Sequence, residues 1–240
     1  MPTLETPRSS KLPPRRPHTI SADAVAADQR RRLLEALPLA IAENGFDATT
    51  VEDIVKFAQV RRNSFYGQFD NKLDCFAAAH EIAQERLLGV LTFRCYTRVG
   101  SANRIDGALG AGLQLLGENP ALARLIVVEA PAAGAELAAR HYEWLDRYGR
   151  LLCLASVGGD DADGPRPGVE PAVVGGIVSR IKQLVLAGEA KNLPQLRPEL
   201  LQFALSFYGA STPGSSSARG DQDEPAQPQS PERSNVLEPA

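Results

Sequence analysis

The sequence predicts an all-α protein with an N-terminal three-helix domain, of helix-turn-helix type, followed by a larger helical domain. Apolar residues recur at intervals of three and four through most of the chain, as they do on one face of an α-helix. No segment alternates apolar and polar residues with β-branched enrichment, so no strand is predicted. Two short predicted helices meet at a tight turn near residue 59, which gives the first domain its type.

The two ends of the chain differ in composition from the middle. Residues 1–20 contain five prolines and four Lys or Arg residues, which predicts a disordered basic arm. Residues 211–240 are rich in Ser, Gly, Pro and Gln, which predicts a disordered tail. The folded part divides at about residue 72, into a domain at 21–72 and a domain at 73–210.

The first predicted helix covers about residues 22–44. Leu33, Leu34, Leu37 and Ile41 form its apolar stripe, and Gly45 follows as a residue that can adopt the left-handed C-cap. Pro38 lies inside this helix, where it removes one backbone hydrogen bond. We expect a kink there, at a cost of roughly 3 kcal/mol if nothing compensates.

Three more helices are predicted at about 50–57, 61–67 and 71–96. Thr49 or Thr50 is a good N-cap for the first of them, and Glu52 and Asp53 lie in its first turn, where the helix dipole favours acidic groups. The helix at 71–96 is long, with apolar residues recurring along one side. The turn between the first two lies at Gln59 and Val60.

Five further helices are predicted at about 102–117, 120–130, 133–155, 171–189 and 194–209. A loop rich in Gly, Asp and Pro separates the third from the fourth, at 157–170. The last two helices carry broad apolar stripes, wider than the inner side of one small domain needs. Tyr142, Trp144 and Tyr148 share the helix at 133–155, as packing or pocket-lining residues.

Several chemistries have no support in the sequence. No glycine-rich phosphate loop, nucleophile elbow or pair of carboxylates at catalytic spacing is present, so we expect no enzyme and no cofactor. His18, His80 and His141 lack the spacing of metal ligands, and three separated cysteines do not form a disulfide framework. The N-terminus lacks the features of a secretory signal, and no apolar run reaches 18 residues, so we expect a cytoplasmic protein without a membrane span.

The segment from Thr49 to Asp74 carries the functional information. A helix that enters the major groove of DNA needs exposed polar residues at its N-terminal end and an apolar rear face. The polar set is Arg61, Arg62, Asn63 and Ser64, and the apolar set is Val60, Phe65 and Phe69. Residues 1–72 also have a formal charge of +2 against −5 for the remainder, which fits contact with DNA at one end of the molecule.

Two further side chains in this segment suit the DNA backbone. Tyr66 offers a phenol that can donate a hydrogen bond to a phosphate. Lys72 stands at the start of the long helix, where unpaired N–H groups and an ammonium together make an anion site.

The order of residues in this segment resembles the DNA-binding domain of the tetracycline-repressor (TetR/AcrR) family. The resemblance covers about residues 28–90, and its most specific part is Tyr66-x-x-Phe69-x-x-Lys72, preceded by Gly45-Phe46 and Thr49-Thr50-Val51. The rest of the chain resembles the family only in being helical and of the right length.

The resemblance implies a ligand-responsive repressor that binds a palindromic operator in double-stranded DNA as a homodimer. The central helices would enclose a pocket for a small apolar effector. The helices at 171–189 and 194–209 would pair with a second subunit in a four-helix bundle. By position, the residues implied in DNA contact are Thr50, Arg61, Arg62, Asn63, Ser64, Tyr66 and Lys72.

Two positions depart from the family pattern. Gln59 stands where the turn usually has Gly, and Arg61 stands where the reading helix commonly opens on a small hydroxyl residue. Two alternatives therefore stay open, a helical scaffold that has lost DNA binding, which Gln59 and Pro38 favour, and an all-α enzyme. The sequence does not identify the effector or the operator, and it does not distinguish a repressor from an activator.

Overall fold

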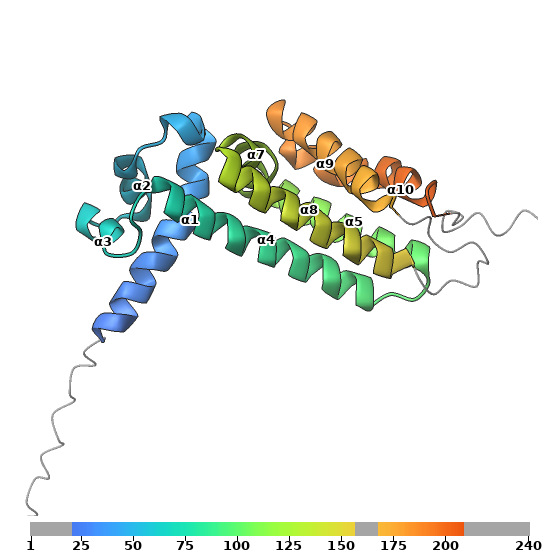
Figure 1. Ribbon diagram of the computed structural model, residues 1–240, viewed down its shortest axis with the longest axis horizontal. Helices are drawn as coiled ribbons and strands as arrows, with labels where there is room; N and C mark the ends of the chain where they lie inside the picture. The colour runs from blue at the N-terminus through green and yellow to red at the C-terminus, as the bar shows by residue number, and fades with distance from the viewer. Residues whose placement is uncertain (1–20, 157–167, 209–240) are drawn as a thin grey trace, which may run out of the picture.

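The computed structural model describes residues 21–156 and 168–208, and these contain helices and no strand. A small N-terminal head and a larger helical body are joined by the long helix α4, which runs out of the head and along the body (Figure 1). The all-α, two-part architecture is as predicted. The arm at 1–20, the tail at 211–240 and most of the loop at 157–170 lie outside the described residues.

Three helices build the head: α1 (Ala22–Ala48), α2 (Val51–Ala58) and α3 (Arg62–Tyr66). The hydroxyl of Ser21 caps α1 by accepting a hydrogen bond from the Ala24 N–H at 3.1 Å. Three residues of the predicted stripe of α1 are fully buried and Leu34 is partly buried, and all four pack in one core with residues such as Ile54 and Phe65. Burial of this stripe holds α2 and α3 against α1, and these two helices are too short to be stable alone.

The end of α1 differs from the prediction. Gly45 has a positive φ of 76°, but its ψ of 164° is extended, so it breaks the helix without forming a left-handed cap. One more helical turn follows to Ala48, and the Thr49 N–H donates to the Gly45 carbonyl at 3.2 Å. Pro38 lies inside α1, yet the break in helical backbone angles comes at Gly45.

The body contains α4 (Lys72–Tyr96), α5 (Ser101–Glu118), α6 (Pro120–Arg124), α7 (Ala130–Ala132), α8 (Ala135–Ser156), α9 (Glu170–Leu186) and α10 (Arg197–Leu205). A π-helical turn, η1 (Leu125–Glu129), lies between α6 and α7, and a 3₁₀ helix, η2 (Ala190–Leu196), precedes α10. The prediction of one continuous α-helix at 120–130, and of another at 194–209, is therefore wrong in detail, because each range is divided between different helix types. Figure 1 shows α9 and α10 on the opposite side of the body from α4.

Small residues let the body helices approach closely. A Cβ on Gly112 of α5 would lie 2.8 Å from the side chain of Leu91 on α4, and a Cβ on Gly176 of α9 would lie 2.8 Å from the ring of Phe203 on α10. All three cysteines are free. Within the described part of the chain, no helix combines the length and apolarity needed to cross a membrane.

Candidate nucleic-acid interface and ligand cavity

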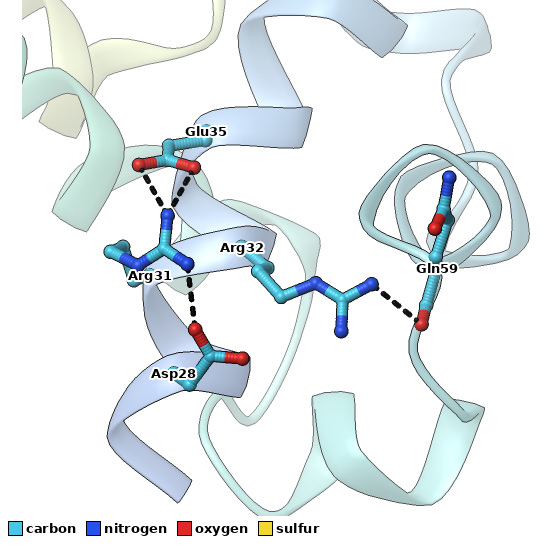
Figure 2. A network of polar contacts seen from close by, with 5 residues as sticks. All are labelled: Asp28, Arg31, Arg32, Glu35 and Gln59. Atoms are coloured by element: carbon cyan, nitrogen blue, oxygen red, sulfur yellow. Dashed lines mark hydrogen bonds and ion pairs between the residues drawn. The ribbon is translucent and has the colours of Figure 1, made fainter. Parts of the chain in front are cut away.

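The turn between α2 and α3 is left-handed at Gln59, with φ 53° and ψ 44°. Arg32 of α1 donates from Nη2 to the Gln59 carbonyl oxygen at 2.9 Å, whereas Arg31 faces away and pairs with Asp28 and Glu35 (Figure 2). The turn therefore keeps the conformation that glycine would favour, at the cost expected for a residue with a Cβ. The hydrogen bond from Arg32 connects the Gln59 carbonyl group to α1.

A second arginine of α1 holds the end of α3. Arg30 donates from Nη1 to the Gln68 carbonyl at 3.2 Å, and its guanidinium lies 4.4 Å from the centre of the Phe69 ring. Arg30 and Arg32 thus fix the ends of both helices of the helix-turn-helix. The sequence analysis missed these two roles, since their carbonyl partners lie 38 and 27 residues away along the chain.

The short helix α3 presents the predicted polar residues outward. Arg61, Arg62 and Asn63 are exposed and Ser64 is half-buried, while Phe65 and Phe69 are buried behind them. Arg61 is the N-cap residue, and its side chain makes no capping hydrogen bond. The first turn of α3 is therefore a polar surface anchored by an aromatic rear face.

Arg62 and Tyr66 form a connected pair on this surface. Arg62 Nη2 donates to the Tyr66 hydroxyl at 3.4 Å, its guanidinium lies 5.7 Å from the ring centre, and Nη1 lies 3.7 Å from the Glu52 carboxylate. Tyr66 itself is 49% exposed. These contacts hold the guanidinium and the phenol in one orientation next to α2.

Thr50 is engaged in the N-terminal cap of α2. Its hydroxyl accepts from the Asp53 N–H at 3.2 Å and donates to the Asp53 carboxylate at 2.7 Å, and the Thr50 N–H also donates to that carboxylate. These hydrogen bonds hold the pKa of Asp53 below its usual value. Thr50 remains exposed to solvent.

Lys72 differs from the expectation of a free ammonium. Its Nζ donates to the carbonyl oxygens of Phe46, Thr49 and Asp47 at 2.6, 2.8 and 3.2 Å, and lies 4.4 Å from the centre of the Phe46 ring. An ammonium has three protons, so all of them are used. Lys72 therefore clamps the last turn of α1 to the start of α4.

Glu129 of the π-helical turn η1 connects the body to the same turn of α1. This buried carboxylate accepts from the Phe46 N–H at 3.0 Å through one oxygen and from Arg124 Nε at 2.8 Å through the other. Isolated π-helical turns are frequent at functional sites. The peptide unit on each side of Phe46 is thus bound by a residue from a different part of the body.

An apolar cavity of about 130 Å³ lies in the body between α4, α5, η1, α8 and α9. Leu, Ile, Val, Ala and Gly side chains make up nearly all of its wall, including Ile126 and Val127 of η1. Its polar lining residues are Gln84, His141 and Tyr148. Tyr142, on the same helix as the last two, is exposed instead, and Trp144 is buried with its ring N–H donating to Glu81 at 3.2 Å.

The polar residues of the cavity belong to a buried hydrogen-bonded chain. The Tyr148 hydroxyl donates to the Gln84 side-chain carbonyl, and the Gln84 amide lies 3.0 Å from His80 Nε2. Nδ1 of His80 and Nδ1 of His141 are both buried without a hydrogen-bond partner. Burial lowers the pKa of His80 to about 4, lowers that of His141, and raises that of Tyr148.

Comparison with known families identifies the head. Residues 33–79 match the sequence model of the bacterial regulatory proteins of the tetR family. This part of the chain belongs to the tetR family. The matched TetR-family segment includes the turn at Gln59, all of α2 and α3, and the clamp residue Lys72. A comparison with curated protein sequences gives no match.

Solved structures extend the likeness to the body of the chain. The fatty acid degradation regulator FadR of Bacillus halodurans has a TM-score of 0.65 at 19% identity, over 73% of this chain and 97% of its own. FadR of Bacillus subtilis, solved with stearoyl-CoA, has a TM-score of 0.64 with the same identity and coverage. SmeT, the repressor of a multidrug efflux pump of Stenotrophomonas maltophilia, reaches 0.60 at 21% identity, over 75% and 91%. The whole described chain therefore has the fold of these regulators.

Among residues 21–156 and 168–208, no three His, Cys, Asp or Glu side chains gather as metal ligands. The matched family model and the similar solved structures are those of regulators, and none of these comparisons indicates an enzymatic activity.

Proposed function

We propose that the protein is a ligand-responsive transcriptional repressor that binds a palindromic DNA operator as a homodimer. The observation that carries this proposal is the polar first turn of α3, exposed and held rigidly by Phe65, Phe69 and the two arginines of α1. A short helix with this layout is what the major groove accepts. The membership of residues 33–79 in the tetR family supports the same conclusion.

The residues on this surface form two groups, one suited to base edges and one suited to phosphates. Arg61, Arg62, Asn63 and Ser64 would reach base edges, where donors and acceptors distinguish one sequence from another. Tyr66 and Thr50 would contact phosphates, which position the protein without reading sequence. Lys72 would act by holding α1 and α4 together, because its three protons are already donated to carbonyl oxygens.

The homodimer would form through α9 and α10, the helices that replace those predicted at 171–189 and 194–209. The apolar stripes of these helices face inward more than expected. Ile181, for example, is 6% exposed and lines the cavity, so it does not belong to a dimer seam. Leu186 is 56% exposed near the end of α9, where an apolar side chain gains from burial against a second subunit. A twofold axis there would match a palindromic operator.

The response to a ligand would pass through η1. Ile126 and Val127 line the cavity, and Glu129, on the same turn, binds the last turn of α1. A ligand that shifts η1 would thus move the head relative to α4. The stearoyl-CoA complex of Bacillus subtilis FadR and the repressor SmeT, both of the same fold, support the pairing of ligand response with repression.

The proposal is tested by adding the protein to labelled DNA from the region upstream of its own coding sequence and measuring binding by fluorescence anisotropy. We expect specific binding, and we expect Arg62→Ala to weaken it by about 5- to 150-fold, since one base contact contributes roughly 1–3 kcal/mol. Arg31→Ala is the matched control, because Arg31 faces Asp28 and Glu35 instead (Figure 2). Unchanged affinity in a folded Arg62→Ala protein would remove α3 as the reading helix. The alternative, a helical scaffold, predicts no specific binding at all.

A further inference from the structure

An acidic side chain lies beside the exposed arginine of α3. Glu52 stands in the first turn of α2, and its carboxylate lies 3.7 Å from Nη1 of Arg62. The side chain of Glu52 is 70% exposed and that of Arg62 is 61% exposed, so both charges face solvent. Asp53, the other acid of this turn, is bound to Thr50 in the N-terminal cap. Glu52 therefore places a negative charge next to a surface proposed to meet DNA.

A carboxylate in this place opposes simple attraction to DNA. Binding without sequence preference depends on positive groups that neutralise phosphates. Like charges brought together at an interface cost free energy and exclude unsuitable partners. A phosphate that approaches Arg62 would also approach Glu52, and it would compete with this carboxylate for the guanidinium.

The pair with Glu52 is compatible with a contact from Arg62 to a base. One N–H of the guanidinium is donated to the Tyr66 hydroxyl at 3.4 Å and one points toward Glu52, so three of its five N–H donors remain. A bidentate contact to guanine uses two donors and brings no anion close to the carboxylate. Glu52 thus opposes a phosphate at Arg62 more than it opposes a base.

We propose that Glu52 is a specificity-determining residue that acts through Arg62, because its carboxylate keeps the guanidinium away from phosphates and so weakens binding to DNA that lacks the operator sequence. Operator binding changes less, since Arg62 can contact a base while it stays paired. Discrimination between partners often uses a group that disfavours the wrong one. The proposal rests on the DNA-binding function above and names how that site separates its operator from other DNA.

Two labelled duplexes of equal length test it, one from the region upstream of the protein's own coding sequence and one with the same bases in scrambled order. Dissociation constants of the full chain would be measured by fluorescence anisotropy at several salt concentrations. We expect Glu52→Gln to bind the scrambled duplex about two- to fivefold more tightly, the range for one exposed ion pair, and the upstream duplex with a smaller change. For the scrambled duplex, the slope of log binding constant against log salt concentration should steepen by up to about one unit, because Arg62 gains a phosphate.

The same substitution in an Arg62→Ala background tests the route. There Glu52→Gln should no longer tighten binding to the scrambled duplex, because the group that Glu52 restrains is gone. Glu35→Gln is the matched control, since it removes the same charge from an exposed carboxylate paired with an arginine of α1, and it should change both duplexes alike (Figure 2). Circular dichroism shows whether each variant is folded, and Glu52→Ala removes the same charge if the Gln variant is not.

Three results would overturn the proposal while leaving the DNA-binding function intact. Equal tightening on both duplexes, or the same tightening with and without Arg62, would mean that Glu52 acts only as a charge. Weaker binding of the upstream duplex alone would mean that Glu52 itself contacts a base. Lower stability with an unchanged ratio of the two constants would leave Glu52 as an acid that favours the helix dipole. A wild type that binds both duplexes equally would overturn the operator-reading function, and this inference with it.

Discussion

Gln59 shows how a single residue can carry strain without changing a turn. Its left-handed backbone is adopted at lower cost by glycine, so Gln59→Gly should raise the free energy of unfolding by about 0.5–1 kcal/mol. The hydrogen bond from Arg32 should survive, because it uses the backbone carbonyl. Urea denaturation measures the change. Gln59→Ala, which keeps a Cβ, is the control, and a Gly variant no more stable than the Ala variant would contradict the prediction.

Lys72 is the residue whose expected role changes most. Lys72→Met keeps the apolar stem but removes three hydrogen bonds from a charged donor, so the free energy of unfolding should fall by about 1.5–3 kcal/mol. The salt dependence of operator binding should stay as in the wild type. The opposite result would be unchanged stability together with a plot of log binding constant against log salt concentration whose slope is smaller by about one unit. That result would show that Lys72 makes the phosphate contact that the family resemblance implies.

At the scale of elements, η1 is the piece through which the body holds the head. Glu129→Ala should speed hydrogen exchange at the Phe46 amide and lower the free energy of unfolding by about 1–3 kcal/mol, since a partly buried donor loses its acceptor. Exchange followed by NMR or mass spectrometry measures the effect. Glu136→Ala is the control, because Glu136 is exposed and pairs with Arg140 on its own helix. Unaltered exchange at Phe46 would show that Glu129 does not hold this turn.

The elements that could be predicted from sequence are those fixed by local spacing. The helices of the head and α4 follow from apolar stripes and from the cap at Thr50, and the polar first turn of α3 follows from the order of its residues. The π-helical turn η1 and the 3₁₀ helix η2 have no local signal. The contacts of Phe46 with Lys72 and Glu129 span 26 and 83 residues, so only the folded chain reveals them.

Apolar periodicity also leaves open which neighbour covers a stripe. Ile181 and Leu186 belong to one stretch of α9, yet the first faces the cavity and the second faces outward. A helix can bury a stripe against its own subunit, a ligand or a second subunit, and the spacing is the same in each case. The substitution Ile181→Glu would therefore damage the core of the subunit and would not test the dimer.

For the whole molecule, the proposed dimer predicts a concentration-dependent assembly. The wild type should sediment as a dimer at micromolar concentration, and Leu186→Glu should shift it to monomers by placing a charge in an apolar seam. The monomer should also lose tight operator binding, since each head alone makes half the contacts. Ile82→Glu is the control, on a side chain of α4 that is 50% exposed. A wild type that stays monomeric and still binds a palindrome tightly would contradict the dimer.

The two polar bonds at Phe46 have a consequence for how such proteins diverge. Glu129 accepts a hydrogen bond from the N–H of this residue, and Lys72 donates one to its carbonyl oxygen, so both bonds are made to main-chain atoms. Every amino acid except proline offers the same two atoms at position 46. Mutational drift there can alter the aromatic packing and still preserve the link between head and body. In an alignment of relatives, covariation would then report only the contact between the Phe46 ring and Lys72, and it would not reveal the two main-chain bonds.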